Sequence, residues 1–364
     1  MKGYPQNAGN TLPSPGPAVN TPHGPEIKIT LDPPNKVFFI TADAQMPKIK
    51  ATCQLPASVP TASPSVPDPT TSSATAQSYD WDVTVTLNPA GVPYAVGRTT
   101  RHSPIRVTTV VPELILPFTQ VRGGTLTVTV GTMLEGKRLT GKAVAEIRGT
   151  NPSATLIRAE GASDILMKLM KLESSLQQFL TTRAKTGYPV FSHDGLGGVG
   201  LGQITHPRPT DDAVWDWKTN VRIAKAQWES KHRDAKRLLQ NYASSSEFRD
   251  LVRQYNQNRT GTAPLKPLTI TLPSITDEML DNETIRLYNG APRPNGQSLQ
   301  EYRAEVDENG LLVVDVAKDG LHGTAHWQQV TEAARTAFYD SNNLNLNLRG
   351  DPDYVNHVRS QVVP

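Results

Sequence analysis

The chain of 364 residues has little cysteine, little excess of one charge and no long apolar run. Its one cysteine, Cys53, excludes an intrachain disulfide framework, a thiolate zinc cluster and an iron–sulfur site. No run of about 18 apolar residues occurs, so the sequence predicts no membrane span. The formal charge of +3 is too small for a protein that binds nucleic acid by neutralising phosphates.

The N-terminal residues lack an apolar stretch as well. Residues 1–25 contain Lys2 followed mostly by Pro, Gly, Asn, Ser and Thr, whereas a secretory signal needs about 7–15 apolar residues. We therefore expect a chain that is made in the cytoplasm and leaves it, if at all, by a route that does not recognise such a signal. The composition of residues 1–25 is typical of a flexible, Pro-rich tail.

Proline is concentrated in the first part of the chain. Fourteen of the 30 prolines precede residue 70, which excludes a helical N-terminal domain. Short segments of alternating or β-branched residues follow the tail, at 27–31, 36–42, 49–55, 79–87, 105–111, 125–130 and 141–147. Their number and spacing favour an all-β immunoglobulin-like sandwich over residues 26–151, interrupted by a loop at 56–77.

Helix signals dominate after a turn-rich join at 149–153. Ser163 is suited to cap a helix that runs to about Lys185, with Asp164 in its first turn. Its predicted apolar stripe consists of Ile165, Leu169, Leu172, Leu176 and Phe179. Further helices are predicted over 215–242, 247–255, 277–288 (capped by Thr276), 327–338 and 353–362, with a lone strand at 311–316. The expected fold class is multidomain, with a mainly α domain over 154–364.

Glu173 is the carboxylate whose position in the sequence is most informative. Leu169 and Met170 precede it by one turn of the predicted helix and Leu176 follows it, which places Glu173 at the edge of the buried stripe. Partial burial would raise its pKa, as a general acid working near neutral pH requires. The alternative is a surface glutamate whose methylene groups pack on leucines.

A glycine-rich segment contains G-x-G-x-x-G at Gly195, Gly197 and Gly200. A dinucleotide-binding motif of this form opens a helix, which Pro207 would interrupt almost at once. A glycine-lined backbone that lets an extended polymer approach closely fits the segment better. A mobile surface loop is the alternative.

Two histidines have the spacing of metal ligands. His322 and His326 stand four residues apart, as on one face of a helix, but Gly323 lies between them and no glutamate adjoins them. A solvated pair is therefore expected. Cys53 lies in a strand-like segment and is expected in a core. The sequence predicts neither a metal nor a cofactor.

Four segments occur in the order found in the family 1 lytic transglycosylases. They are Glu173-Ser174, 200–205, Asn220-Val221 and 288–290. The chain from about Ala154 onward therefore resembles this lysozyme-like family, and is closest to its variants in phage and type VI-secreted proteins. The resemblance implies cleavage of the β-1,4 bond between N-acetylmuramic acid and N-acetylglucosamine in peptidoglycan.

The resemblance also implies a role for each motif. Glu173 would be the catalytic acid and base, and Tyr288 would place its hydroxyl near the Glu173 carboxyl, with Tyr255 as a rival for that position. The implied substrate-binding residues are Ser174, Gly200, Leu201, Gln203, Ile204, Asn220, Tyr288 and Asn289. Ser174 would support Glu173 from the same helix, and Gln203 would bind a sugar.

The number of carboxyl groups separates two reactions. A lytic transglycosylase closes the C6 hydroxyl on C1 to give a 1,6-anhydro sugar with one carboxyl, whereas hydrolysis usually uses two. Asp194, Asp211 and Asp212 are candidates for a second carboxyl, so a lysozyme-type muramidase is the alternative. No cofactor is implied by either reaction.

The sequence departs from the family pattern at three places. Gly202 stands where methionine is usual, and Ala224 stands where glycine is usual. About 60 residues separate Tyr288 from Tyr354-Val355, which resembles the family's closing helix. That stretch has the character of an insertion.

A substrate in the cell wall and the missing signal together indicate a delivered protein. We expect a type VI secretion effector that acts in the periplasm or cell wall of a target cell, with a secretion spike protein and a cognate immunity protein as partners. A phage lysis or virion-borne enzyme is the alternative. A third interpretation is an interaction protein whose sandwich docks onto a spike or wall polymer and whose lysozyme-like domain is degenerate.

Overall fold

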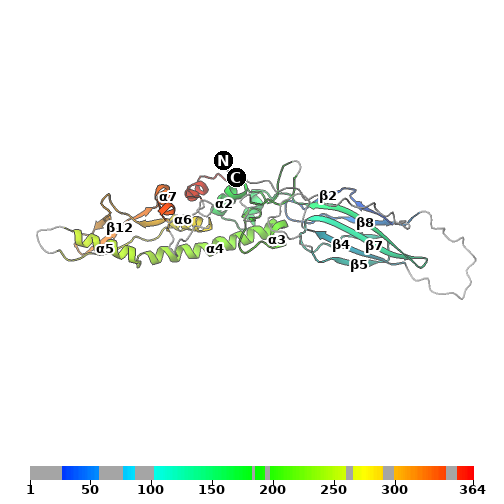
Figure 1. Cartoon of the computed structure of the whole chain (residues 1–364), viewed down its shortest axis with the longest axis horizontal. Helices are drawn as coiled ribbons and strands as arrows, with labels where there is room; N and C mark the ends of the chain where they lie inside the picture. Colours follow the sequence, from blue (N-terminus) through cyan, green and yellow to red (C-terminus); the bar gives the residue numbers. More distant parts are fainter. Residues whose placement is uncertain are drawn as a thin grey trace, which may run out of the picture.

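The computed structural model describes residues 27–56, 77–86, 102–182, 185–192, 197–259, 265–289, 299–341 and 351–364. The predicted tail at 1–25 and most of the predicted loop at 56–77 lie outside these ranges. The molecule is elongated, with a β region at one end and a longer, mainly helical region at the other (Figure 1). Within the described ranges, none of the helices combines the length and apolar character needed to cross a membrane.

The described part of the β region forms two sheets. The smaller sheet has the strand order β1-β3-β6 and is antiparallel; its strands are β1 (Lys28–Asp32), β3 (Lys50–Gln54) and β6 (Glu113–Ile115). The larger sheet has the order β2-β8-β7-β4-β5, with only the β2–β8 pair parallel. Its strands are β2 (Val37–Phe39), β4 (Tyr79–Thr86), β5 (Ile105–Thr109), β7 (Gly124–Leu134) and β8 (Lys137–Arg148).

The two sheets share one apolar core because residues alternate along the strands. In β4, Trp81 and Val83 point into this core, whereas Asp80 and Asp82 lie on the opposite face of the strand. From the smaller sheet, Cys53 packs in the same core, as expected. The seven predicted strands each correspond to an observed strand. The assignment to an immunoglobulin-like type stays a prediction.

In the described ranges, the helical region contains eight helices. They are α1 (Ala154–Ala159), α2 (Asp164–Ser174), α3 (Asp211–Trp215), α4 (Trp217–Tyr242), α5 (Ser246–Asn258), α6 (Asp277–Tyr288), α7 (Glu332–Ser341) and α8 (Tyr354–Arg359). Side-chain N-caps begin most of them; Ser163 caps α2 and Thr276 caps α6, both as predicted.

Two apolar clusters divide this region. The first, the central core, joins α1, α2, the first half of α4, α6 and α8. The second and a smaller satellite lie in a distal lobe, formed by α5, α7 and two small sheets together with the end of α4. The sheets are β11-β12-β9 and β10-β13, built from β9 (Thr269–Thr271), β10 (Tyr302–Ala304), β11 (Val314–Val316), β12 (His322–Ala325) and β13 (Trp327–Gln329).

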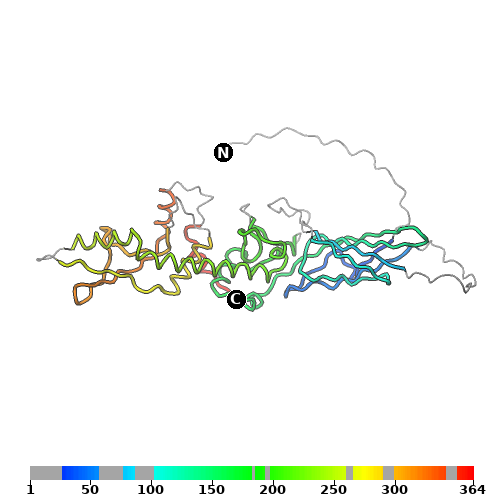
Figure 2. The backbone as a smooth tube through the Cα atoms, turned by 90° about the horizontal axis from the view of Figure 1, so that it is seen from below, coloured from blue at the N-terminus to red at the C-terminus, as the bar shows by residue number. Residues whose placement is uncertain are grey.

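The long helix α4 connects the two clusters. Figures 1 and 2 both show it running along the molecule from the central core to the distal lobe. Because α5 and β9 precede α6 in the chain, the distal lobe is larger than the stretch after Tyr288 that the sequence marked as an insertion. Helix α6 returns the chain from the lobe to the central core.

The β region and the central core are packed directly on each other. A Cβ added at Gly123 would lie 1.9 Å from the Trp215 ring, and one at Gly149 would lie 2.2 Å from the Phe179 ring. The Trp217 indole N–H donates to the Ala42 carbonyl at 3.0 Å. The side chains of Phe179 and Trp215 therefore belong to the apolar core of the β region, although they follow it in sequence.

Two predicted helices have different bounds in the structure. The helix that starts after Ser163 ends at Ser174 and not near Lys185, because Ser175 and Leu176 adopt left-handed φ angles of 57° and 61°. Phe179 then pairs with Pro189 in a β-bridge. The last two members of the predicted stripe are therefore not helical.

The second difference concerns the predicted helix at 327–338. Its first residues form β13, and α7 begins only at Glu332. His322 starts the strand β12 and His326 follows it, so their spacing of four does not place them on one helical face. The predicted lone strand at 311–316 is β11, which pairs with β12 in a sheet.

Candidate active site

Glu173 lies in the last turn of α2. The sequence had placed it in the middle of a longer helix. Leu169 and Met170, one turn earlier, are fully buried in the central core. The N–H of Ser175 closes the helix on the Lys171 carbonyl at 3.0 Å, after which the chain turns away. Glu173 is left half-buried at the end of the helix.

The Tyr354 hydroxyl donates a hydrogen bond to the Glu173 carboxylate. Tyr354 begins α8, which packs against α2 and α6, and only 6% of its surface is exposed. Burial, followed by the charge of Glu173, raises the pKa of Tyr354 well above its usual value. The hydroxyl therefore keeps its proton and remains a donor to the carboxylate.

Tyr288 ends α6 and lies close to the same carboxyl. Its hydroxyl donates to the Gly202 carbonyl at 3.1 Å, and burial together with the nearby charge of Glu173 raises its pKa. Its side chain packs against the central core, whereas Tyr255 of α5 packs against the core of the distal lobe. The geometry favours Tyr288 over Tyr255 as the tyrosine near Glu173, although the direct hydrogen bond comes from Tyr354.

The glycine segment is held against this site by a buried glutamine. Gln178 accepts a hydrogen bond from the Leu201 N–H at 3.1 Å and donates to the carbonyls of Ala213 and Val214 at 3.1 and 2.9 Å. Gly200 has a φ of 68°, and a Cβ there would lie 2.2 Å from the Gln178 side-chain oxygen. Only glycine fits at position 200.

Asn220, in the first turn of α4, holds the segment from the other side. Its fully buried amide accepts from the Gly202 N–H at 3.0 Å and donates to the carbonyls of Val199 and Ala213 at 2.9 and 3.1 Å. Ile204 is buried and pairs with Val199 in a β-bridge. The predicted residues Asn220 and Ile204 thus shape the loop backbone from within.

Ser174 and Gln203 also contact the loop. The Ser174 hydroxyl lies 2.9 Å from the Met170 carbonyl and 3.0 Å from the Leu201 carbonyl, so it ties the end of α2 to the glycine segment. The Gln203 amide donates to the Gly200 carbonyl at 2.9 Å, and Gln203 has a left-handed φ of 44°. Both side chains are thus engaged with the backbone of the site itself.

The remaining predicted residues lie elsewhere. Asn289 donates to the Asp351 carbonyl at 3.2 Å and so joins the end of α6 to the segment before α8. Asp211 and Asp212 occupy the first turn of α3, where their charges act on His102 of the β region. Asp194 lies outside the described residues.

The two single-residue departures from the family pattern contact each other. A Cβ added at Gly202 would lie 2.6 Å from the Cβ of Ala224, one helical turn after Asn220. Gly202 has no left-handed φ, so the Ala224 methyl group is the closest obstacle to a side chain there. The missing side chain at one position makes room for the methyl group at the other.

Sequence reasoning missed the role of Gln178 and assigned none to the Tyr354 hydroxyl. The sequence signal for Gln178 is weak: it is a polar residue directly before the apolar residues Phe179 and Leu180. Tyr354 stood out only as part of a segment similar to the family's closing helix. For neither residue does the local sequence pattern predict which atom its side chain contacts.

The arrangement suits proton transfer by a carboxyl group. Glu173 is half-buried and oriented by a tyrosine hydroxyl, and the glycine segment beside it is buried, with its backbone held by the amides of Gln178 and Asn220. In the described ranges, no three side chains of His, Cys, Asp or Glu gather in a way that would hold a metal ion. His326 instead lies between Glu305 and Asp315, at 3.3 and 2.9 Å.

Comparison with known proteins finds no family model, curated protein or solved structure that matches the chain. The resemblance to the lytic transglycosylases therefore rests on the four sequence motifs. The structure adds that the four segments meet at Leu201 and Gly202, where Ser174 contacts Leu201 and where Asn220 and Tyr288 contact Gly202. Tyr354 contacts the carboxylate of Glu173, the residue before Ser174.

Proposed function

We propose that this protein is a peptidoglycan lytic transglycosylase in which Glu173 is the acid and the base. The observation that carries the proposal is the hydrogen bond from the Tyr354 hydroxyl to the Glu173 carboxylate, at the point where the motif segments meet. These segments are far apart in sequence, and polar contacts join them at Leu201 and Gly202, next to the helix end that carries Glu173. A surface glutamate has no need of such a setting.

The reaction follows from one carboxyl group. Protonated Glu173 donates its proton to the oxygen that leaves C1 of N-acetylmuramic acid as the glycosidic bond breaks. The resulting carboxylate then accepts the proton of the C6 hydroxyl while the C6 oxygen bonds to C1, which gives the 1,6-anhydro product and returns Glu173 to its acid form. Tyr354 orients the carboxyl in both steps.

A muramidase is the second candidate, because a further carboxyl lies near the site. Asp351 precedes α8 by three residues, and its charge contributes to the raised pKa of Tyr354. In hydrolysis, Asp351 would supply the second carboxyl group, which activates the attacking water or stabilises the charge that develops at C1. It would take the role for which the sequence offered Asp194, Asp211 and Asp212. Replacement Asp351→Asn abolishes hydrolysis under this alternative and leaves transglycosylation largely intact.

The site of action proposed is the periplasm or cell wall of a target cell. A type VI secretion effector, carried by a spike protein and neutralised in the producer by an immunity protein, fits such an enzyme; a phage lysis enzyme is the alternative. Periplasmic expression is expected to lyse cells and cytoplasmic expression is not. Equal harmlessness in both compartments would contradict either delivery route.

The deciding experiment is mass spectrometry of the products released from purified peptidoglycan. The wild type is expected to release anhydro-muropeptides, one water lighter than the products of hydrolysis. Glu173→Gln is expected to lower the rate by about 100-fold or more while the protein stays folded. Glu229→Gln, on the exposed face of α4, is the matched control and should keep the full rate.

Three results would change the conclusion. Reducing-end muropeptides would make the protein a muramidase. Full activity in Glu173→Gln would remove Glu173 from the mechanism. A wild type that releases nothing, although folded, would favour a degenerate wall- or spike-binding protein.

A further inference from the structure

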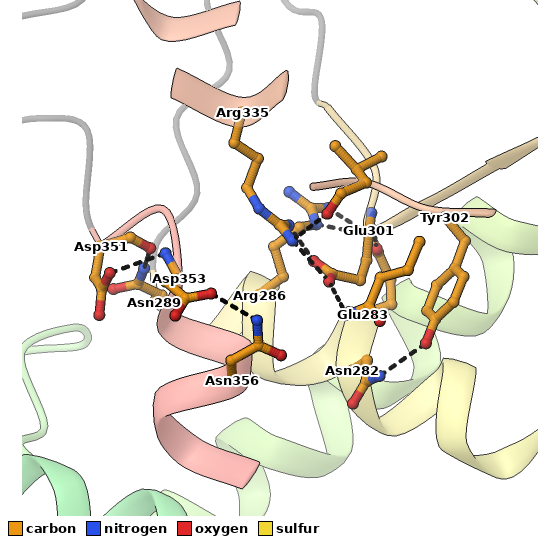
Figure 3. Close-up of polar contacts among 12 residues, drawn as sticks. Asn282, Glu283, Arg286, Asn289, Glu301, Tyr302, Arg335, Asp351, Asp353 and Asn356 are labelled. Carbon is orange, nitrogen blue, oxygen red and sulfur yellow. Dashed lines mark hydrogen bonds and ion pairs between the residues drawn. The ribbon is translucent and has the colours of Figure 1, made fainter. Parts of the chain in front are cut away.

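Four buried charged side chains connect α6 to the distal lobe. Glu283 and Arg286 come from α6, and Glu301 and Arg335 come from the lobe, next to β10 and in α7 (Figure 3). These four residues, here called the charge quartet, are between 0% and 6% exposed. Their two positive and two negative charges balance.

The contacts run in sequence across the boundary. The Glu283 carboxylate accepts from the Arg286 Nε at 3.1 Å and from the backbone N–H of Glu301 at 2.6 Å. The Glu301 carboxylate accepts from the Arg335 guanidinium at 2.9 Å and from the Gln329 amide at 2.8 Å. The lobe and α6 are thus joined through the Glu283 carboxylate, and the Glu301 carboxylate ties β13 and α7 to this joint within the lobe.

Stability alone is a weak reason for such a cluster. Removing four charges from water is costly, and apolar side chains of the same volume often stabilise a fold as well or better. Burial raises the pKa of Glu283 even though Arg286 opposes it, which shows that the desolvation is not fully compensated. What charge-paired hydrogen bonds supply is a defined geometry between the elements that carry them.

A second polar link joins three elements at one residue. The buried Asn282 side chain of α6 donates to the Tyr302 hydroxyl of the lobe at 2.7 Å and accepts from the Arg359 Nε of α8 at 2.6 Å. The Tyr302 contact is visible in Figure 3. Asn282 therefore couples the position of α8 to that of the lobe.

Both links end at the candidate active site. Helix α6 ends with Tyr288 and α8 begins with Tyr354, the two tyrosines near Glu173. Arg286 and Arg335 of the quartet and Tyr354 of the site line the same small cavity of about 10 Å³. A displacement of α6 or α8 relative to the lobe would move a hydroxyl that faces the reacting carboxyl.

We infer that Glu301, Arg335, Asn282 and Tyr302 are positioning residues, through which the distal lobe holds Tyr354 and Tyr288 in place around Glu173. The lobe is then a working part of the active site and not an appended module. The part of this inference that concerns catalysis rests on the proposed function and is tested by kcat. The part that concerns the position of α8 does not rest on it and is tested by hydrogen exchange.

The sharpest variant is Tyr302→Phe, which removes the hydroxyl bonded to Asn282 and keeps the ring. We expect kcat to fall roughly tenfold or more with little change in KM, because a misplaced catalytic group slows the chemical step. We also expect the alkaline limb of the pH profile of kcat to move to higher pH, since Glu173 must be protonated to act as the acid and its ionised form loses part of its hydrogen-bond donor. A purely structural hydroxyl would alter neither quantity.

The second variant replaces the lobe's half of the quartet by apolar side chains, as Glu301→Leu with Arg335→Met. Its matched control removes an exposed pair on α4, as Asp234→Asn with Arg237→Met, and should behave as wild type. Hydrogen exchange of residues 354–359 is expected to become roughly tenfold faster in Tyr302→Phe and in the quartet variant, with exchange in β4 and β7 unchanged.

The outcomes separate the two proposals. Unchanged exchange at 354–359 in a folded Tyr302→Phe overturns the positioning role, whatever the activity. Faster exchange with unchanged kcat and pH profile also overturns it. If the wild type cleaves nothing, the proposed function fails and the exchange data alone decide. If the quartet variant does not fold, Tyr302→Phe decides.

Discussion

The β region and the helical region bury polar side chains to very different extents. Among the residues described in the β region, the buried polar side chains are Thr84, Arg122 and Thr132. In the helical region they are Ser174, Gln178, Asn220, Asn282, Glu283, Thr284, Arg286, Glu301 and Arg335. Each such group must find a partner, because an unpaired polar group in a core is costly.

The difference follows from how each region holds distant segments together. In the β region the backbone ladder does so, and side chains only need to alternate between core and solvent. The helices satisfy their own backbone internally, so their mutual positions depend on side chains. Around Glu173, where position decides chemistry, those side chains are polar and directional. The lesson is that buried amides and charges mark the part of this fold where geometry matters most.

The largest expected effect tests this contrast through one buried residue in each region. Asn220→Leu leaves the buried Gly202 N–H without its partner and removes one of the donors to each of the Val199 and Ala213 carbonyls, so we expect a loss of about 3 kcal/mol in the free energy of unfolding. Thr132→Val, which removes a hydroxyl that donates to the Ser78 carbonyl, is expected to cost about 1 kcal/mol. Denaturant unfolding measures both, and equal losses would contradict the contrast.

The next effect concerns the contact between Gly202 and Ala224. Gly202→Ala brings two methyl groups within 2.6 Å, and we expect a loss of about 1–3 kcal/mol from overpacking. Adding Ala224→Gly should recover most of that loss, because it removes the obstacle. Thermal unfolding of the two single variants and the double variant gives the coupling energy. Additive effects would show that the two positions do not compensate.

Local patterns predicted the fold well where contacts are local. The alternation at 79–87 corresponds to β4, and Thr276 with the apolar pattern after it gives the bounds of α6. The end of α2 was wrong because Ser175 and Leu176 are not glycines, and only surrounding contacts hold them in left-handed conformations. The sequence pattern of residues 327–338 likewise favours a helix. Its first three residues form the strand β13 because they pair with β10.

The candidate site divides in the same way. Sequence motifs pointed to Glu173, Asn220 and Tyr288, which the structure brings around one loop. No motif pointed to Glu301 or Arg335, because charged residues are expected at the surface and their partners are distant in sequence. Such pairs have no periodic signature, so they emerge only when the chain is folded.

A smaller effect is expected from charge pairs of the β region. The Asp82–Arg106 pair spans 3.2 Å, but its side chains are 37% and 79% exposed. Solvent screens such a pair, so Arg106→Ala should change the free energy of unfolding by less than about 0.5 kcal/mol. Denaturant unfolding at low and moderate salt checks this. A loss as large as that of a buried partner would mean that exposure is not what separates the two regions.

The smallest effects concern two histidines, one in each region, whose pKa values move in opposite directions. Burial, aided by Arg122, lowers the pKa of His102 below its usual 6.5. The hydrogen bond that the His357 ring donates to the Asp351 carboxylate, together with the charge of that carboxylate, raises the pKa of His357 above 6.5. NMR titration of the two ring C–H signals measures both values.

The signs give opposite pH dependences. His357 gains from its charged form, so its contribution to stability is complete below pH 6.5 and disappears as pH rises through its own pKa. His102 is held neutral, so its contribution is present above pH 6.5 and is lost as the pH falls through its lowered pKa. Asp351→Asn should return the pKa of His357 toward 6.5 and leave that of His102 unchanged. If the pKa values of both histidines shifted in parallel, the two regions would respond to a change of charge together. The contrast between a region held by backbone hydrogen bonds and a region held by side chains would then not extend to their electrostatics.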